Sequence, residues 1–273
     1  DRRVHHELPQ APRVRSASAQ EGQVVVRSWI VALFLLASCG ESAPPPPPTS
    51  PPAPKVSPKF GSIEGWVRVD SNDIAPITGS VVGFEKYCGQ GPLELGIYLV
   101  DSATKGLSGA YVEADGVSLA FQTESIPVLD QKACLFTPTL LVVPPGTVLF
   151  KNSDGMPHNV TIETKLNGRV SEGFPGGEAI TKKFPFEEKL AVRCTVHPWM
   201  QAGLVITRGT AHAVSDKGGR FRIERVEAGK RRVRAWHLLG DEVSVEVDVP
   251  PDGVAQVEIP WKPRANFRAA FGR

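Results

Sequence analysis

The chain has 273 residues and a formal net charge of +2, with 41% hydrophobic and 22% charged residues. This composition is typical of a soluble globular protein of one or two domains. It excludes a protein with many membrane spans, a collagen-like chain and a wholly disordered chain, and the small net charge gives no indication of nucleic-acid binding.

The N-terminal segment has the pattern of a secretory signal. Residues 1–23 are polar without a helical or strand period, and we interpret them as upstream translation. Arg27 then precedes an apolar run of about nine residues and several small residues, which is the order found in signal peptides. Residues 36–39, Leu-Ala-Ser-Cys, resemble a bacterial lipobox, in which the cysteine is lipidated after cleavage. We therefore expect residues 1–39 to be an upstream segment and lipoprotein signal peptide, with an ordinary signal peptide as the alternative.

The next segment, residues 40–59, is rich in proline. Nine of its twenty residues are Pro, including residues 44–48. Proline cannot donate to a strand ladder, so this segment is predicted to be an extended spacer without a core. A lipid at Cys39 followed by this tether predicts an exported bacterial lipoprotein, periplasmic or on the cell surface, whose folded part is held away from the membrane.

From residue 60 onward, short strand-like runs alternate with Gly, Pro, Asn and Asp turns. No helical period is sustained, so the pattern predicts an all-β fold of sandwiches or barrels. About 200 residues suffice for two small cores. The expected strands are residues 63–69, 95–100, 110–114, 139–143, 147–152, 159–163, 188–194 and 203–207, and then residues 211–215, 220–223, 230–237, 243–249 and 255–259.

Charge distribution suggests where the two cores divide. Residues 60–207 contain eleven basic and sixteen acidic residues, a net charge of −5, whereas residues 208–234 contain nine basic and three acidic residues, a net charge of +6. We therefore predict a first domain at residues 60–207, a smaller β domain at residues 208–262 and a tail at residues 263–273. The basic run is interpreted as the solvated face of a sheet, with steering of an acidic partner as the alternative.

One short segment combines three kinds of metal-binding side chain. Cys194, His197 and Met200 lie within seven residues, on a tight loop predicted to join two strands. His158 follows another expected strand and offers a second imidazole. Two His, one Cys and a weak axial Met form the ligand set of a blue-copper site. Thiolate and thioether favour Cu(I) while imidazoles tolerate Cu(II), so a rigid mixed site suits electron transfer.

Two motifs in these segments resemble the cupredoxins, and within them amicyanin and pseudoazurin. They are Met-Pro-His-Asn-Val at residues 156–160 and Cys-Thr-x-His-Pro-x-Met at residues 194–200. The resemblance implies a Greek-key sandwich that holds one type 1 copper. It implies that His158, Cys194 and His197 are the strong ligands and that Met200 is the axial ligand.

The same resemblance assigns roles around the ligands. Asn159, with Thr195, is expected to tie the first ligand loop to the Cys loop just outside the ligands. His197 is expected to face solvent and pass electrons, and Pro198 and Trp199 are expected to form part of an apolar docking patch for the redox partner.

A wider resemblance covers roughly residues 60–260. Gly65-x-Val67, the Tyr-Cys-Gly at residues 87–89 and residues 130–138 resemble a group of bacterial exported cupredoxin-like proteins. Residues 214–237 resemble a carboxypeptidase regulatory-like domain, a transthyretin-like sandwich, although Leu238 replaces that group's usual acidic residue. With Cys39 assigned to lipid and Cys194 to copper, Cys88 and Cys134 remain, and an exported protein permits a disulfide between them.

Several redox classes lack their motifs in this sequence. It has no Cys-x-x-Cys-His for covalent haem, no second Cys beside Cys194 for dinuclear copper and no His-x-His pair for a multicopper oxidase. We therefore predict a non-enzymatic carrier of single electrons, tethered to a membrane, with a redox protein such as a cytochrome or dehydrogenase as partner and without nucleic acid. The alternatives are a copper delivery or accessory protein, a non-redox surface interaction module, a metal-free cupredoxin and a zinc site.

Overall fold

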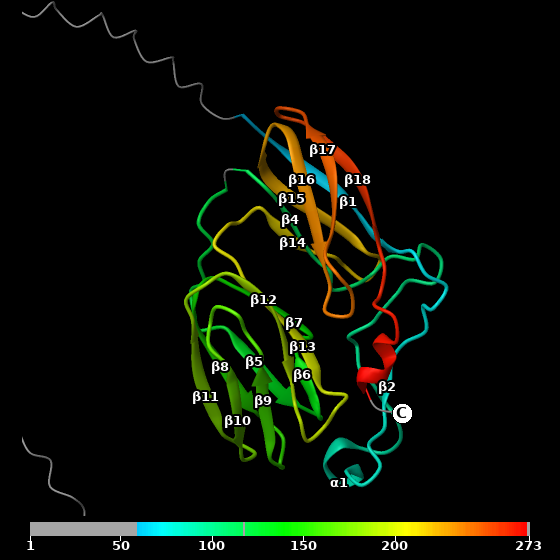
Figure 1. Cartoon of the computed structure of the whole chain (residues 1–273), viewed down its shortest axis with the longest axis vertical. Helices are drawn as coiled ribbons and strands as arrows, with labels where there is room; N and C mark the ends of the chain where they lie inside the picture. The colour runs from blue at the N-terminus through cyan, green and yellow to red at the C-terminus, as the bar shows by residue number, and fades with distance from the viewer. Residues whose placement is uncertain (1–58, 117, 272–273) are drawn as a thin grey trace, which may run out of the picture. The chain divides into compact units, whose positions relative to one another are not determined.

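The computed structural model describes residues 59–116 and 118–271. The predicted signal peptide, Cys39 and the proline-rich tether lie outside the described residues. The chain divides into two units, residues 1–54 and 55–273, and every described residue belongs to the second unit. This unit consists almost entirely of strands (Figure 1), which confirms the predicted all-β fold.

The first group of strands, called here the central sandwich, uses the middle of the chain. One sheet has the order β10-β9-β12-β13-β7 and the other the order β11-β8-β5-β6, and parallel pairs join β13 to β7 and β5 to β8. The strands are β5 (Val128–Lys132), β6 (Leu135–Thr137), β7 (Leu140–Val143), β8 (Gly146–Asn152), β9 (His158–Ile162), β10 (Val170–Phe174), β11 (Ala179–Phe184), β12 (Glu188–Arg193) and β13 (Gln201–Ile206).

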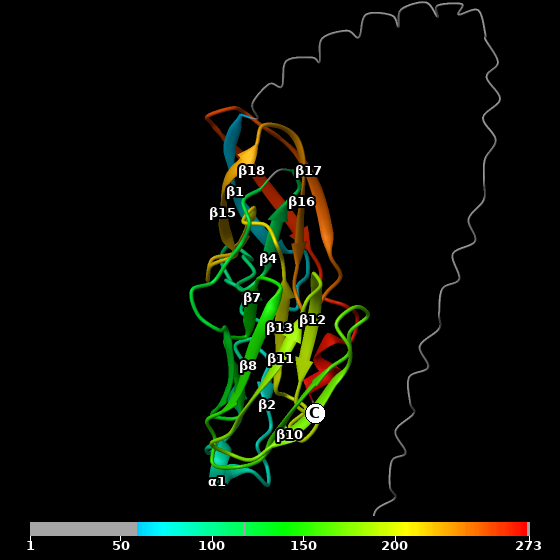
Figure 2. The same cartoon turned by 90° about the vertical axis from the view of Figure 1, so that its left-hand side faces the viewer.

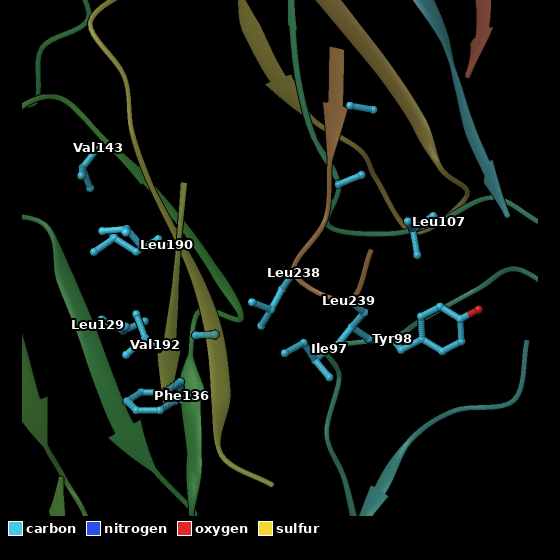
Figure 3. Close-up of a cluster of buried hydrophobic side chains, with 14 of the residues drawn as sticks. Ile97, Tyr98, Leu107, Leu129, Phe136, Val143, Leu190, Val192, Leu238 and Leu239 are labelled. Atoms are coloured by element: carbon cyan, nitrogen blue, oxygen red, sulfur yellow. The ribbon is translucent and has the colours of Figure 1, made fainter. Parts of the chain in front are cut away.

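Alternating side chains form the core of the central sandwich. Leu190 and Val192 of β12 point inward with a period of two residues, as a half-buried strand requires. Figure 3 shows them gathered with Leu129 and Phe136 of the opposite sheet. All six residues of β13 are buried, since the strand lies inside its sheet between β12 and β7 and both of its faces are covered, with Trp236 packed against Gly203.

The second group of strands, called here the terminal sandwich, uses both ends of the described chain. Its sheets have the orders β15-β1-β18 and β14-β4-β16-β17. Figure 2 shows these strands above the central sandwich. The strands are β1 (Phe60–Val69), β4 (Tyr111–Ala114), β14 (His212–Val214), β15 (Arg220–Glu227), β16 (Gly229–Trp236), β17 (Val243–Val249) and β18 (Val254–Trp261).

The strand pairing distributes the chain differently from the predicted division at residue 207. β1 runs antiparallel to β15 and parallel to β18, and β4 pairs with β14 and β16. Two strands that precede the central sandwich in sequence therefore complete the terminal sandwich. Alternation in a strand reveals which face is buried but not which partner it pairs with, so a boundary drawn from charge cannot detect this exchange.

Several individual strands also differ from expectation. Residues 95–100 form no strand although Leu95, Ile97 and Tyr98 are buried, because Gly96 adopts a φ of +64° and interrupts the extended backbone. The structure adds β5, β6, β10 and β11, which the sequence pattern did not indicate. β10 and β11 lie at sheet edges with exposed, charged side chains, so their apolar alternation is weak.

A long connection between β1 and β4 packs along the side of the molecule. It contains the short ladder β2 (Thr78–Gly79) with β3 (Leu93–Glu94) and the one-turn helix α1 (Glu85–Cys88). A disulfide joins Cys88 to Cys134 in the β5–β6 hairpin, with Cα atoms 5.3 Å apart. In the part of the chain described, no helix has the length and apolar character needed to cross a membrane.

The predicted tail, residues 263–273, is part of the folded unit as far as residue 271. It carries the 3-10 helix η1 (Phe267–Phe271), whose Phe271 is buried. Arg268 forms a bidentate ion pair with Asp73 of the long connection, with nitrogen–oxygen distances of 2.6 and 2.8 Å. The end of the chain therefore fastens the connection that carries α1.

Charged and apolar contacts join the two sandwiches. Lys189 Nζ of β12 lies 2.7 Å from a carboxylate oxygen of Glu113 on β4, and Arg234 of β16 binds the same oxygen at 3.0 Å. Figure 3 shows Leu239, which follows β16, beside Ile97 and Tyr98 of the long connection. The hydrophobic core is continuous from one sandwich to the other.

Candidate metal centre

Three predicted ligands come together at one end of the β9-β12-β13 sheet. His158 is the first residue of β9, Cys194 follows the last residue of β12, and His197 lies in the loop that leads to β13. Because β12 pairs with both β9 and β13, the ends of these strands meet. The same loop carries Met200, immediately before β13.

Backbone hydrogen bonds hold the ligand loop in a compact shape. The N–H of Cys194 donates to the carbonyl of Met200 at 3.0 Å, and the N–H of Met200 donates to the carbonyl of His197 at 2.9 Å. All four predicted ligands are buried, with exposed fractions of at most 2%. Their local geometry is therefore set by main-chain bonds and packing rather than by exposed side-chain contacts.

The donor atoms of His158, Cys194 and His197 all lie within 4.8 Å of one another. Nδ1 of His158 is 3.0 Å from Nδ1 of His197, and Sγ of Cys194 is 3.7 Å from Nδ1 of His197. Metal–nitrogen bonds of about 2.0 Å and metal–sulfur bonds of about 2.3 Å span such separations from one shared ion. Two imidazoles and a thiolate suit a soft transition metal, so these residues fit copper.

Electrostatics within this cluster favour a charged thiolate. Burial would raise the pKa of the Cys194 thiol, but hydrogen bonds from His158 and His197 and from neighbouring backbone N–H groups lower it to about 6. Burial would lower the pKa of His158, but Asp154 and the thiolate raise it to about 9. The thiolate is the form in which cysteine binds metals, whereas His158 would have to give up a ring proton to bind one.

A carboxylate that the sequence analysis did not identify contacts the first histidine. Nε2 of His158 lies 2.8 Å from Oδ2 of Asp154, whose side chain is 8% exposed. Burial would raise the pKa of the Asp154 carboxyl, whereas hydrogen bonds from His158 and from the backbone N–H groups of Cys134 and Ala133 lower it. The only indication in the sequence is that Asp154 stands four residues before His158.

Hydrogen bonds between Asn159 and Thr195 connect the two segments that carry the predicted ligands. Oδ1 of Asn159 accepts a hydrogen bond of 2.7 Å from the backbone N–H of Thr195, and its Nδ2 donates to the hydroxyl of Thr195. The backbone carbonyl of Asn159 also accepts a 2.9 Å bond from Nε2 of Gln131, which is fully buried. The strand that carries His158 is thereby fixed to the loop that carries Cys194 and His197.

His197 differs from its expected exposure, because the long connection covers it. The side chain is fully buried. The ring of half-buried Phe84, immediately before α1, meets the His197 ring edge-on with centroids 4.5 Å apart, and the Trp199 ring lies 5.0 Å away. Nε2 of His197 is buried without a hydrogen-bond partner among the described residues.

The expected docking patch of Pro198 and Trp199 is also altered. Pro198 is exposed, but Trp199 is 5% exposed and its Nε1 donates to the carbonyl of Cys134 at 3.1 Å. The side chain of Trp199 is therefore part of the core beneath α1. The Cys88–Cys134 disulfide holds α1 in this position, so the loop and its cover form one packed unit.

The other described histidines have structural roles. Nδ1 of His237 accepts a 3.3 Å bond from the backbone N–H of Leu239, and its ring contacts Trp261. His212 bonds the carbonyl of Gly209 at 2.9 Å. Both belong to the terminal sandwich, apart from the His158 cluster.

No family model and no curated protein matches the chain. Among solved structures, a purple cupredoxin from Nitrosopumilus maritimus matches with a TM-score of 0.26 and 20% identity over 30% of this chain and 99% of that chain. Amicyanin from Paracoccus versutus matches with a TM-score of 0.28 and 19% identity over 35% of this chain and 97% of that chain.

A copper-containing nitrite reductase from Thermus scotoductus also matches, with a TM-score of 0.29 and 16% identity. This match covers 34% of the chain and only 27% of the nitrite reductase. At these scores, the assignment of the site depends on the geometry of this chain's own residues.

Proposed function

We propose that the protein binds one copper ion through His158, Cys194 and His197, with Met200 as a weak axial ligand, and carries single electrons between redox proteins. The observation that carries this proposal is the convergence of two Nδ1 atoms and one thiol sulfur in a buried cluster. Bound copper would supply a one-electron couple between Cu(II) and Cu(I).

The surrounding residues suit electron transfer because they resist movement. The loop is closed by main-chain hydrogen bonds, Asn159 fastens it to β9, and Phe84 and Trp199 pack against His197. A donor set that keeps its positions in both oxidation states needs little rearrangement when an electron arrives or leaves. The burial of the ligands also excludes water from the cluster.

The same burial favours a carrier over a copper delivery protein. A delivery protein must exchange ligands with its target, which requires an accessible thiolate or thioether. Cys194 is 2% exposed and Met200 is fully buried, beneath a cover that a disulfide holds in place. We therefore infer that copper is retained during function, and that the redox partner, a cytochrome or dehydrogenase, contacts the outside of this end of the central sandwich.

Copper loading with visible spectroscopy tests the proposal. The purified chain should bind one copper per molecule, show an intense absorption near the red end of the visible range, and give a reversible one-electron wave. Cys194→Ser should abolish the absorption, because it arises from charge transfer between copper and thiolate. His212→Ala, which removes a histidine of the terminal sandwich, should leave it unchanged. A colourless copper-loaded protein would contradict the type 1 assignment.

Retention of copper is tested by competition with a chelator. A carrier should lose its copper slowly to the chelator while its voltammetric wave stays reversible. Rapid transfer of copper to the chelator, with a poorly reversible wave, would favour the delivery protein. Normal biological activity of a His158→Ala variant would favour a surface interaction module.

We further propose that the protein is exported and anchored at a membrane through lipid on Cys39. Support comes from the signal-like and lipobox-like residues 24–39 and from the proline-rich residues 40–59. Radiolabelled palmitate should be incorporated into the protein in a bacterial host and should be lost in a Cys39→Ala variant. A protein that stays unlabelled and remains in the soluble fraction would contradict the anchor.

A further inference from the structure

Asp154 occupies the centre of a small hydrogen-bond network next to the metal ligands. Its Oδ2 lies 2.8 Å from Nε2 of His158 and accepts a 2.9 Å bond from the backbone N–H of Cys134. Its Oδ1 accepts a 2.6 Å bond from the backbone N–H of Ala133. The two oxygens of a carboxylate have enough lone pairs to accept from all three donors.

The contact between Asp154 and His158 decides which ring nitrogen keeps the proton once the imidazole is neutral, as a metal ligand must be. A neutral imidazole carries its proton on one nitrogen and a lone pair on the other. With the proton on Nε2 and directed at Asp154, Nδ1 keeps the lone pair. Nδ1 is also the atom that faces Nδ1 of His197 at 3.0 Å. The carboxylate therefore presents the lone pair of His158 to the donor cluster.

The turn that holds Asp154 is itself fixed. Ala133 and Cys134 adopt left-handed φ angles of +53° and +57°, which is uncommon for residues other than glycine and directs their two N–H groups at the carboxylate. Cys134 is joined to Cys88 by the disulfide, and its carbonyl accepts the bond from Trp199. The anchored turn thus bonds Asp154 on one side and the ligand loop on the other.

We infer that Asp154 is a positioning residue of the metal centre, which fixes the orientation and the proton of His158 and connects that ligand to the disulfide-anchored turn at Ala133 and Cys134. This inference rests on the proposed copper site. Carboxylate partners of histidine ligands orient the ring and raise its basicity, and their loss typically lowers metal affinity about 10- to 100-fold.

The Asp154→Asn variant tests this role. Its side-chain amide offers one acceptor oxygen for three donors, so at least one of the contacts to His158 and the turn is lost. Removing the negative charge should weaken Cu(II) binding more than Cu(I) binding. We expect Cu(II) affinity to fall about 10- to 100-fold, and the reduction potential to rise by about 59 mV for each tenfold difference between the two affinities.

Asp130→Asn is the matched control. Asp130 also lies near this end of the sandwich, where it bonds the hydroxyl of Ser153 at 2.8 Å and pairs with Lys151 at 4.0 Å, but it is bonded to no predicted ligand. The control should keep the wild-type potential. Equal potentials in wild type and Asp154→Asn, or equal shifts in both variants, would overturn the positioning role.

A measurement on the wild-type protein covers the case in which Asp154→Asn fails to fold. In the Cu(I) form, nitrogen-15 NMR should show a slowly exchanging proton on Nε2 of His158. A rapidly exchanging proton on Nε2 would overturn the inference, whereas a proton on Nδ1 would contradict ligation by His158 itself. Failure of the wild-type chain to bind copper would refute the proposed function itself, which is a different result from copper binding without an effect of Asp154.

Discussion

The buried histidines of the two sandwiches have different partners. In the terminal sandwich, His237 bonds the backbone of Leu239, and nearby Ser215 likewise donates to the carbonyl of Leu107 at 2.6 Å and accepts from the N–H of Ala110 at 2.9 Å. In the central sandwich, His158, His197 and Cys194 face one another. Buried side chains that bond to the main chain stabilise the fold. Buried side chains that direct their donor atoms at one another can instead bind a common ligand.

This comparison predicts that changes in the two regions affect different properties. Substitutions in the terminal sandwich should lower the free energy of unfolding without altering the copper spectrum of the folded protein. Substitutions around the donor cluster should alter metal binding. Four experiments test this separation, in order of decreasing expected effect.

The largest expected effect is that of Trp261→Ala in the terminal sandwich. Trp261 is fully buried in β18, and truncation of a buried tryptophan typically costs about 3–5 kcal/mol. Chemical denaturation should show this loss, while the folded variant keeps the wild-type visible spectrum. Trp66→Ala, at a partly exposed position on the neighbouring strand β1, should cost less. A changed visible spectrum in Trp261→Ala would show that the terminal sandwich also affects the copper site.

Acid should destabilise the terminal sandwich through His237. Burial lowers the pKa of His237 to about 4, although a hydrogen bond to the backbone of Ile97 opposes this shift. The unfolded chain, with an ordinary histidine pKa near 6.5, therefore binds a proton that the folded chain does not. Stability should fall as the pH drops from about 6.5 towards 4, by at most about 3 kcal/mol.

The difference between wild type and His237→Asn measures this contribution, because other groups also titrate in this range. Between pH 6.5 and 4, the free energy of unfolding should fall less in His237→Asn than in the wild type, and the difference is the contribution of His237. Identical pH profiles for the two proteins would show that His237 does not contribute.

Removing the Phe84 ring that covers His197 should lower the free energy of unfolding by a smaller amount and should also change how fast copper is lost. Phe84 is half-buried, so Phe84→Ala should cost about 2 kcal/mol, less than the loss of a fully buried phenylalanine. It should also speed the removal of copper by a chelator, because the edge contact with His197 is lost. Phe84→Leu should keep most of the cover. Unchanged copper loss in Phe84→Ala would show that the ring does not restrict access.

The smallest expected effect concerns the contact between the regions. Lys189→Ala removes its ion pairs with Glu113 and Glu242, but Glu113 keeps Arg234 at 3.0 Å. We expect a loss of about 1 kcal/mol in the free energy of unfolding. The transition should remain a single step. Two separate transitions would show that this network is what couples the unfolding of the two sandwiches.

The candidate ligands could be predicted from the sequence because they lie in two short motifs. Cys194, His197 and Met200 lie on one loop, and chemistry alone identifies them as candidates. Asp154 was not predicted, because the sequence contains many carboxylates and none of its neighbours marks this one. Its role depends on the fold, which brings it to His158 and to two N–H groups of a turn about twenty residues earlier. Phe84 covers His197 across more than a hundred residues of sequence, and no local pattern encodes that contact.

The assignment of strands to sandwiches shows the same limit. The alternation of β1 correctly indicated a half-buried strand, but its partners β15 and β18 lie more than 150 residues later in the chain. The edge strand β11 has one exposed face and one partly buried face, and the partly buried face includes Lys182 between Ile180 and Phe184, so its apolar alternation is broken by charge. The sequence therefore indicated which segments form strands and which side chains are candidate ligands, but it did not indicate which strands pair over long distances in the chain.

The position of β1 has a mechanical consequence. A pull on the chain before Phe60 would load β1 first, and β1 is hydrogen-bonded along its length to β15 on one side and β18 on the other. Both ladders must break before β1 can leave its sheet. The strands that carry His158 and Cys194 belong to another sheet and are not paired with β1, so detaching β1 would break none of their hydrogen bonds.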